Sequence, residues 1–298
     1  MKAGFVSFIG RPNAGKSTLL NRIVGHKLAI VSDKPQTTRT RIVGVKHYDD
    51  GQVVFVDTPG VHKPTHRMNV RMVDVALDAM RDVDVLTLVV DASAKEGPGD
   101  RHLIGLLRGV KVPVMLALNK VDLIAKARLL PIMDRYRQAH PFVEIAPISA
   151  ADGTNVDLLE MLFLKYLPEG APFYPADYVT DQPDRFFVSE IVREQVLRLT
   201  HAELPFSTAV VVDRVADGDS DKVVAVYCTI LVERSSQKPI VIGKAGAMIK
   251  QIGSAARIEL ERFLNTRVYL DLHVKVKSEW RDNDRVLDDM GLQDRARS

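Results

Sequence analysis

The first 168 residues repeat one pattern, in which a short apolar run is followed by a loop and then by a longer amphipathic stretch. The apolar runs are rich in Val, Ile and Leu and do not strictly alternate, which is typical of strands buried on both faces. They lie at 3–9, 53–56, 85–90, 112–118 and 143–148. The amphipathic stretches predict helices at 16–24, 67–80, 99–108, 123–140 and 155–166. This alternation predicts an α/β domain with a mostly parallel sheet covered by helices.

A different pattern begins after residues 167–175, where three prolines and one glycine cannot continue a helix. The elements expected there are a helix, two strands, a helix and a strand, at 185–199, 208–215, 223–232, 247–264 and 267–276. We therefore predict a first domain, an extended linker, a smaller α+β domain and a solvated tail, at 1–168, 169–184, 185–281 and 282–298.

The composition excludes several classes of protein. Lys and Arg total 41 against 38 Asp and Glu, so the net charge of +3 is too small to indicate nucleic-acid binding, and any basic surface must be local. The single cysteine, Cys228, excludes an internal disulfide framework and fits a reducing compartment; we expect it to be buried. No apolar run reaches the ~18 residues of a membrane span, and residues 1–10 lack a cleavage-like site. We expect a soluble cytoplasmic protein.

Residues 10–17, GlyArgProAsnAlaGlyLysSer, match the phosphate-loop pattern of two glycines separated by four residues and followed by Lys and Ser. The loop lies between a strand and a helix, so its N–H groups and the helix N-terminus would face phosphates. Lys16 would reach the β- and γ-phosphates, and the Ser17 hydroxyl would ligate Mg²⁺. The nucleotide-binding residues predicted in this loop are Gly10, Asn13, Ala14, Gly15, Lys16, Ser17 and Thr18.

The tetrapeptide AspThrProGly at 57–60 directly follows a predicted strand. The Asp57 carboxylate is placed at the strand end to hold Mg²⁺, usually through a water, and the Gly60 N–H can meet the γ-phosphate. Alone, the tetrapeptide is typical of a turn. Its order and distance after the phosphate loop make it a predicted metal and γ-phosphate site.

Two more stretches, residues 119–122 and 149–151, follow predicted strands and predict a site that recognises the nucleotide base. An Asp122 carboxylate can accept two hydrogen bonds from guanine, and adenine lacks that pair of donors. Asn119 would tie the loops together and touch the purine edge, and Lys120 would lie along the base. The tripeptide Ser149, Ala150 and Ala151 could offer the Ala150 N–H to guanine O6.

These stretches have the order and approximate spacing of the G motifs, so residues 1–168 resemble a translation-factor-type small GTPase domain that binds GTP or GDP with Mg²⁺. The remaining motif falls in residues 36–40, GlnThrThrArgThr, which resemble the corresponding stretch of Era and tRNA-modification GTPases. The resemblance implies that one threonine senses Mg²⁺ and the γ-phosphate. We favour Thr38, and Thr37 remains the alternative.

One departure from the GTPase pattern concerns hydrolysis. Many GTPases place a Gln after the Asp-x-x-Gly to orient the attacking water, whereas this chain has Val61 and then His62. Valine cannot accept a hydrogen bond, so we expect slow intrinsic hydrolysis. The resemblance implies that K⁺ bound beside Asn13 supplies part of the missing electrostatic stabilisation; His62 as a base is a weaker hypothesis. The residues assigned to hydrolysis are Lys16, Thr38, Gly60 and Asn13.

Residues 243–246, GlyLysAlaGly, lie between a short apolar run and a predicted helix. They match the GxxG loop of KH domains, which clamps about four nucleotides of single-stranded backbone. GxxG alone is weak, but residues 235–281 contain nine basic and four acidic side chains, a local surplus of five that suits a phosphate-binding face. The expected RNA-binding residues are Ile242, Gly243, Lys244, Ala245, Gly246, Ile249 and Lys250, while Ile252 could line the base groove or the core.

The order of elements in the second domain matches a type II KH domain, and residues 231–234, 241–253 and 274–278 closely resemble the C-terminal domain of the Era family of bacterial GTPases. The resemblance covers nearly the whole chain. It implies binding near the 3′ end of 16S rRNA, a role in maturation of the 30S subunit and peripheral association with the inner membrane. We also expect a monomer.

The sequence therefore predicts a GTP-hydrolysing RNA-binding switch, in which release of the γ-phosphate relaxes the threonine loop. Three alternatives remain. The first domain could be an ATPase or nucleotide kinase, which Asn119 and Asp122 disfavour. It could hold nucleotide without hydrolysing it, as a noncatalytic gate for RNA binding. The chain could also be a related GTPase that acts on tRNA, which the GxxG domain disfavours.

Overall fold

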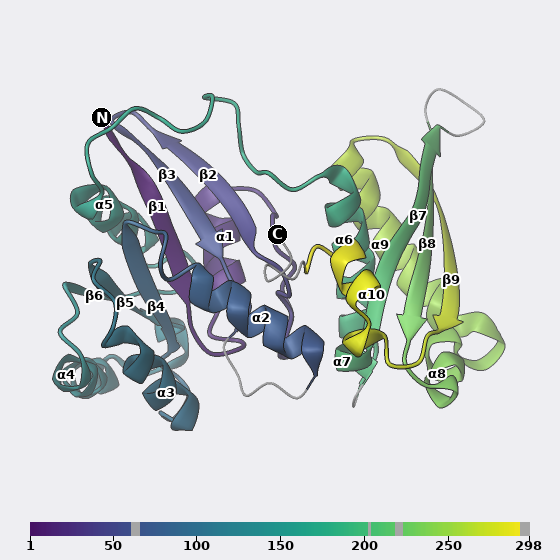
Figure 1. The fold of residues 1–298 in the computed structure, drawn as a ribbon, viewed down its shortest axis with the longest axis horizontal. Coiled ribbons are helices and arrows are strands. Elements are labelled where there is room, and N and C mark those ends of the chain that lie inside the picture. Colours follow the sequence, from purple (N-terminus) through teal and green to yellow (C-terminus); the bar gives the residue numbers. More distant parts are fainter. Residues whose placement is uncertain (61–65, 202–203, 218–222, 293–298) are drawn as a thin grey trace. The chain divides into compact units, whose positions relative to one another are not determined.

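The computed structural model describes residues 1–60, 66–201, 204–217 and 223–292 (Figure 1). Contacts divide the chain into two compact units. The first comprises residues 1–65 and 69–181, and the second comprises residues 66–68 and 182–298. Val61 and His62, with their predicted bearing on hydrolysis, lie outside the described residues.

The first unit contains a six-stranded sheet in the order β2-β3-β1-β4-β5-β6. Only the β2–β3 pair is antiparallel, and every other pair is parallel, which confirms the predicted fold class. The strands are β1 (Lys2–Ile9), β2 (Ile42–Tyr48), β3 (Gly51–Asp57), β4 (Val85–Asp91), β5 (Val114–Asn119) and β6 (Glu144–Pro147). The helices are α1 (Lys16–Val24), α2 (Arg67–Asp78), α3 (Pro98–Leu107), α4 (Leu129–Ala139) and α5 (Val156–Tyr166).

Apolar side chains cover both faces of this sheet. Neighbouring residues of a strand point to opposite faces, so one strand can contribute to both cores. Phe8 of β1 stacks on Phe55 at 5.6 Å between ring centroids, and Phe55 meets Phe163 of α5 edge-on at the same distance. The next residue, Ile9, packs on the other face with apolar residues of α2 and α3. Each large apolar side chain buried in this way contributes roughly 1.5–3 kcal/mol.

Two local predictions for the first unit were wrong. No strand was expected at Ile42–Tyr48, yet β2 pairs with β3 as a hairpin that turns at Asp49 and Asp50. The helix predicted at 123–140 begins only at Leu129, after two short 3-10 turns. Pro131 explains the late start, because its ring would clash with the carbonyl four residues earlier in a longer helix.

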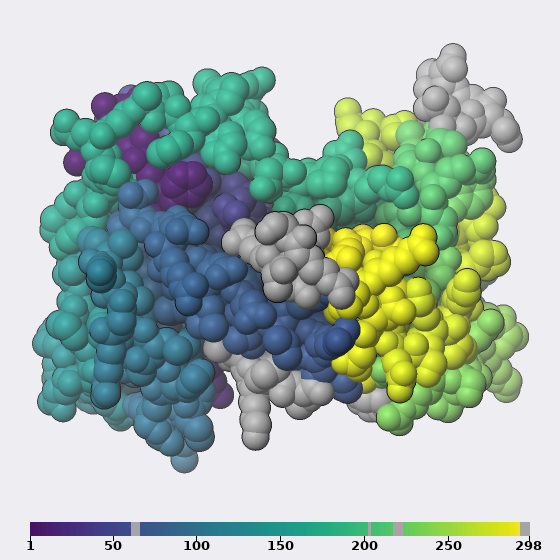
Figure 2. Space-filling view, in the orientation of Figure 1, coloured from purple at the N-terminus to yellow at the C-terminus, as the bar shows by residue number. Residues whose placement is uncertain are grey.

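The segment 169–181, inside the predicted linker, lies against the first unit. Its backbone follows β2, the edge strand: the Val45 N–H donates to Val179 O at 2.8 Å, and the Thr180 hydroxyl donates to Val43 O at 2.7 Å. The Gln52 amide oxygen accepts from the N–H groups of Phe173 and Tyr174. Figure 2 shows this segment in teal over the purple strands of the same unit. It therefore occupies an edge that would otherwise present unpaired backbone groups.

The second unit is a three-stranded sheet in the order β7-β8-β9, in which β7–β8 is antiparallel and β8–β9 is parallel. Its elements are α6 (Asp184–Leu199), α7 (Leu204–Ser207), β7 (Thr208–Asp217), β8 (Val223–Val232), α8 (Lys238–Ile242), α9 (Ala247–Leu264), β9 (Arg267–Val276) and α10 (Asp284–Asp289). Helices α6, α8 and α9 pack with the sheet around one apolar core. The arrangement confirms the predicted smaller α+β domain of the KH type.

Cys228 lies in this core, as expected, with 1% of its surface exposed. Burial raises the pKa of its thiol to about 12, so the group stays protonated and unreactive at neutral pH. None of the helices in the described part of the chain is long and apolar enough to cross a bilayer.

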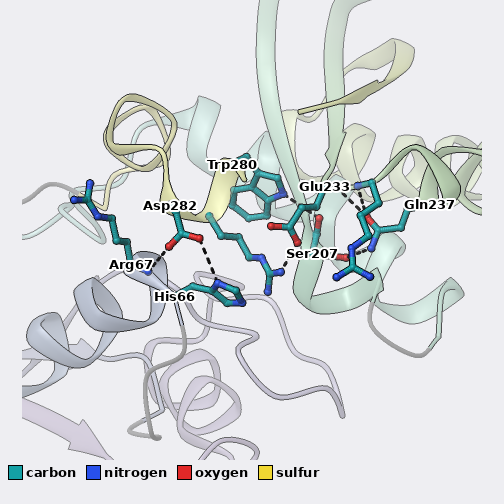
Figure 3. A network of polar contacts seen from close by, with 9 residues as sticks. His66, Arg67, Ser207, Glu233, Gln237, Trp280 and Asp282 are labelled. Atoms are coloured by element: carbon teal, nitrogen blue, oxygen red, sulfur yellow. Dashed lines mark hydrogen bonds and ion pairs between the residues drawn. The ribbon is translucent and has the colours of Figure 1, made fainter. Parts of the chain in front are cut away.

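Part of the solvated tail predicted at 282–298 is buried, as is Trp280 just before it. Trp280 is fully buried, and its indole N–H donates to Ser207 O at 3.0 Å (Figure 3). The Gln237 amide donates to the Ser207 hydroxyl and accepts from the Glu233 N–H, which fixes the same corner of the second unit. Helix α10 follows, and Val286, Leu287 and Leu292 are buried. The many Asp residues of this stretch concealed its apolar positions; residues 293–298 lie outside the described part.

Candidate nucleotide and RNA sites

The phosphate loop of the first unit connects β1 to α1 in a conformation that glycine makes possible. Gly15 has φ 95°, and a Cβ there would lie 2.1 Å from the Asn119 amide nitrogen. Asn13 also has a positive φ, of 63°. The Lys16 ammonium donates to Gly10 O and Arg11 O at 3.3 Å, so it folds back over the loop. Helix α1 begins at Lys16, which directs its N-terminus toward the space that the loop surrounds.

This space is a cavity of about 250 Å³. The cavity brings together eight predicted site residues, Asn13, Gly15, Lys16, Ser17, Thr18, Thr38, Gly60 and Lys120. Gly60 approaches the loop so closely that a Cβ would lie 2.7 Å from Pro12 N. Residues 30–33, which sequence reasoning did not assign to the site, form part of the wall.

Three oxygen-bearing side chains meet at one end of the cavity. The Ser17 hydroxyl donates to the Asp57 carboxylate at 2.7 Å and lies 2.7 Å from the Thr38 hydroxyl, which is itself 3.2 Å from that carboxylate. Asp57 is fully buried, and its second oxygen, Oδ1, has no hydrogen-bond partner among the described residues. Two hydroxyl oxygens at Oδ2 and an unpaired Oδ1 on the same buried carboxylate form a set of hard oxygen donors that fits Mg²⁺. Thr37 does not join them, because its hydroxyl donates to Lys34 O.

Burial disfavours the ionised forms of both Lys16 and Asp57. Desolvation lowers the pKa of Lys16, and the neighbouring Asp57 carboxylate offsets only part of that shift. Desolvation likewise raises the pKa of Asp57, although Lys16, Ser17, Thr38 and the Thr58 backbone act in the opposite direction. A dication at Asp57 and phosphates near Lys16 would each favour the ionised form of the neighbouring side chain.

Asn119 connects the phosphate loop to the predicted base reader. Its amide nitrogen donates to Ala14 O at 2.8 Å, and its amide oxygen accepts from the Ala150 N–H at 2.9 Å. The Ala150 N–H, expected to donate to guanine, donates instead to Asn119. Asp122 lies exposed in the 3-10 turn at Val121–Leu123 and is not among the residues that line the cavity; Ser149 is buried and caps the loop by accepting from the Asp152 N–H.

The GxxG loop of the second unit joins α8 to α9. Gly243 has φ 74°, and a Cβ there would lie 2.6 Å from Met248 N, so the turn requires glycine. Lys244 and Ala245 are exposed at its tip. Ile242 is half-buried and packs against the core, and Ile252 is fully buried within it. Of the two places proposed for Ile252, the structure therefore selects the core.

A groove of about 310 Å³ continues from the start of α9 toward β9. It is lined by Ile249, Lys250, Gly253, Ser254, Arg257, Leu270 and Leu272. Gly253 adds no side chain to the groove, and a Cβ there would be in ordinary van der Waals contact with Leu272 at 3.5 Å. The apolar floor with Lys250 and Arg257 beside it can hold stacked bases and pair with phosphates.

Comparisons with known proteins match both units. A family model described as a 50S ribosome-binding GTPase matches residues 5–120, and a KH-domain model matches residues 203–281. GTPase Era of Geobacter metallireducens is 50% identical over 290 residues, which are 97% of this chain and 97% of that protein. The chain belongs to the GTPase Era family.

Solved Era structures match nearly the whole chain. An Era variant of Aquifex aeolicus bound to GDP.AlF4⁻ is 40% identical, with a TM-score of 0.95 over 98% of this chain and 100% of that one. A structure of Era in complex with MgGDPNP and nucleotides 1506–1542 of 16S ribosomal RNA gives the same identity and TM-score over 98% and 99% of the two chains. GTPase Era of Geobacter sp. strain M21 is 50% identical over 98% of both chains.

Several residues at the sites of this Era-family chain escaped the sequence analysis. Asp91, at the end of β4, binds Lys120, and nothing in its local sequence indicates that contact. Leu270 and Leu272 line the groove only because β9 lies beside α9. Gly253 and Arg257, by contrast, follow Ile249 and Lys250 at helical spacing, a signal that could have placed them on the same helix face.

Proposed function

We propose that this Era-family GTPase hydrolyses GTP in the cavity of its first unit, with Mg²⁺ held by Ser17, Thr38 and Asp57. The observation that carries the proposal is that the Ser17 and Thr38 hydroxyls meet at Asp57 Oδ2, while the buried Asp57 Oδ1 has no hydrogen-bond partner among the described residues. When bound, Mg²⁺ would neutralise charge on the β- and γ-phosphates. The ligands in two solved Era structures, GDP.AlF4⁻ and MgGDPNP, support the assignment.

The chain's own residues have distinct parts in this proposal. The Lys16 ammonium, now 3.3 Å from two loop carbonyls, would turn toward the phosphate oxygens, and the Gly60 N–H would donate to the γ-phosphate. Asn119 would hold the phosphate loop beside the base reader. Asp122 would accept two hydrogen bonds from guanine, which adenine cannot donate.

K⁺ stimulation through Asn13 belongs to the same proposal. The chain lacks a Gln at position 61 to orient water. Asn13 has a left-handed backbone, and its side-chain amide donates to Asp33 O at 2.5 Å, which joins the phosphate loop to the segment that carries Thr38. A monovalent cation beside Asn13 would stabilise developing phosphate charge as an arginine finger does.

Hydrolysis by Thr38→Val and Thr37→Val, in KCl and in NaCl, tests these assignments. Thr38→Val should lower the turnover number about a hundredfold, the usual cost of removing one stabilising ligand. Thr37→Val is the matched control and should stay within about twofold of the wild type, because its hydroxyl donates to Lys34 O and not to the metal cluster. Equal effects of the two variants would contradict the metal site. Equal wild-type turnover in KCl and NaCl would contradict the K⁺ proposal alone.

We further propose that the groove beside the GxxG loop binds the 3′ region of 16S rRNA, and that the protein acts in assembly of the small ribosomal subunit. The apolar floor and the neighbouring Lys250 and Arg257 support RNA binding, and the Era complex with nucleotides 1506–1542 supports the choice of RNA. The GTP-bound state would control access of RNA to the groove; equal RNA affinity with GDP and a GTP analogue would contradict that coupling. Cytoplasmic location, peripheral association with the inner membrane and a monomeric state stay predictions.

A further inference from the structure

Asp91 lies at the carboxyl end of β4, directly opposite Asn119 in the register with β5. One carboxylate oxygen, Oδ2, accepts from the Lys120 ammonium at 2.7 Å. The other, Oδ1, accepts from the Ser93 N–H at 2.9 Å and from the Ser93 hydroxyl at 2.5 Å. Both oxygens are therefore occupied, and Ser93, on the same loop, helps to fix the orientation of the carboxylate.

Lys120 occupies an unusual backbone position beside this carboxylate. It has φ 64°, a left-handed conformation that costs a non-glycine residue about 1–2 kcal/mol. Its side chain also lines the cavity of the first unit. A lysine side chain has four rotatable bonds, and fixing it costs up to about 2 kcal/mol of conformational entropy. Something must hold its ammonium if the aliphatic part is to keep one position along the cavity wall.

We propose that Asp91 is a positioning residue for the nucleotide: it anchors the Lys120 ammonium so that the methylene groups of Lys120 form a fixed surface for the face of the purine. The inference rests on the proposed function, a guanine nucleotide in this cavity, and on the sequence-based prediction that Lys120 lies along the base. The anchor also occupies the Lys120 ammonium, so the phosphates are left to Lys16.

Fold stability alone gives no reason for this ion pair. The side chains of Lys120 and Asp91 are 30% and 21% exposed, and pairs with this degree of exposure contribute roughly 0–1 kcal/mol to folding. Burial raises the pKa of Asp91, but the hydrogen bonds from Lys120 and Ser93 outweigh it and hold the pKa below its ordinary value. The carboxylate is thus ionised at neutral pH, as an anchor for an ammonium requires.

The proposal predicts a specific kinetic pattern for Asp91→Asn in the full-length chain. The affinity for fluorescently labelled GDP should fall about fivefold, and the affinity for a GTP analogue should fall by the same factor, because the proposed function assigns the γ-phosphate to Lys16 and Gly60 and not to Lys120. The KM for GTP should rise while the turnover number at saturating GTP stays unchanged. A purely structural role would lower the thermal stability of the free protein and would not produce this split.

A double-mutant cycle with Lys120→Met tests whether Asp91 acts through Lys120. Methionine keeps an apolar stem and removes the ammonium. In the Lys120→Met background, Asp91→Asn should change GDP affinity less than about twofold. Glu144→Gln is the matched control: it removes a carboxylate that pairs with Lys165 at 2.8 Å on the same unit, and GDP affinity should not change.

Several outcomes would overturn the inference. One is an unchanged GDP affinity in Asp91→Asn. Another is that Asp91→Asn changes GDP affinity by the same factor in the wild-type and Lys120→Met backgrounds. A third is that Glu144→Gln lowers GDP affinity as much as Asp91→Asn does. If Lys120→Met itself leaves GDP affinity unchanged, the proposed role of Lys120 fails instead. Should Asp91→Asn unfold, Ser93→Ala gives the same test, because it keeps the carboxylate and removes one of its anchors. It should weaken GDP binding about twofold, and only when Lys120 is present.

Discussion

The nucleotide cavity of the first unit and the groove of the second unit are built on different principles. The cavity is formed largely by loops at the carboxyl ends of parallel strands, and hydrogen bonds hold the side chains of Lys16, Ser17, Thr38 and Lys120 that face it. The groove is formed by one face of α9 and one strand, with an apolar floor and exposed cations. The first arrangement suits one ligand with defined donors and acceptors, and the second tolerates a flexible polymer.

The largest effect should come from Gly15→Ala. The new Cβ would lie 2.1 Å from the Asn119 amide, in a backbone conformation that L-residues disfavour, so both hydrogen bonds of that amide would break. The backbone strain and the two lost hydrogen bonds together cost about 3 kcal/mol of binding free energy, which should weaken GDP binding about a hundredfold. Equilibrium titration with fluorescently labelled GDP measures this loss of affinity.

Gly25→Ala is the matched control for this variant. Gly25 has φ 78°, and a Cβ added there would have no other atom within 4 Å, so only backbone strain of about 1 kcal/mol is added. It should lower thermal stability slightly and leave GDP affinity intact. If both variants lost affinity equally, the cavity would not depend on the close packing described above.

A smaller effect is expected in the groove. Lys250→Ala should weaken RNA binding about three- to fivefold at every sequence tested and reduce the salt dependence of binding by about one phosphate contact. Arg262→Ala, on the same helix, is the control, because Arg262 pairs with Glu259 at 2.8 Å and does not line the groove. Fluorescence anisotropy measures binding over a range of about 50 to 200 mM salt, and an unchanged slope in Lys250→Ala would contradict a polymer groove.

The features that could be predicted from the sequence are those that depend on local motifs or on strong periodicity. The phosphate loop and Asp57 are local motifs, so their neighbours in space follow from the strand order. Helix α9 and strand β9 were also predicted with the bounds observed, because their periodicity is strong. The choice of Thr38 over Thr37 as the threonine that senses Mg²⁺ depended on the resemblance to a family. The structure adds a contact between the hydroxyls of Thr38 and Ser17.

What could not be predicted depends on contacts between distant segments. β2 was missed because its second half is polar, and it becomes a strand only through its pairing with β3. Asp91 contacts Lys120 only because β4 and β5 are in a particular register. The two leucines of the groove likewise need α9 beside β9. Helix α10 was hidden by its Asp residues, although Asn283 provides a recognisable N-cap.

The most direct test of the central claim, that the first unit recognises guanine through the Asp122 carboxylate, is the base preference of Asp122→Asn. An amide in place of the carboxylate loses the acceptor pair for guanine and gains a donor for the xanthine carbonyl. The affinity for GDP should fall more than about a hundredfold while the affinity for xanthosine diphosphate rises above it. Retained preference for GDP in Asp122→Asn would contradict the account.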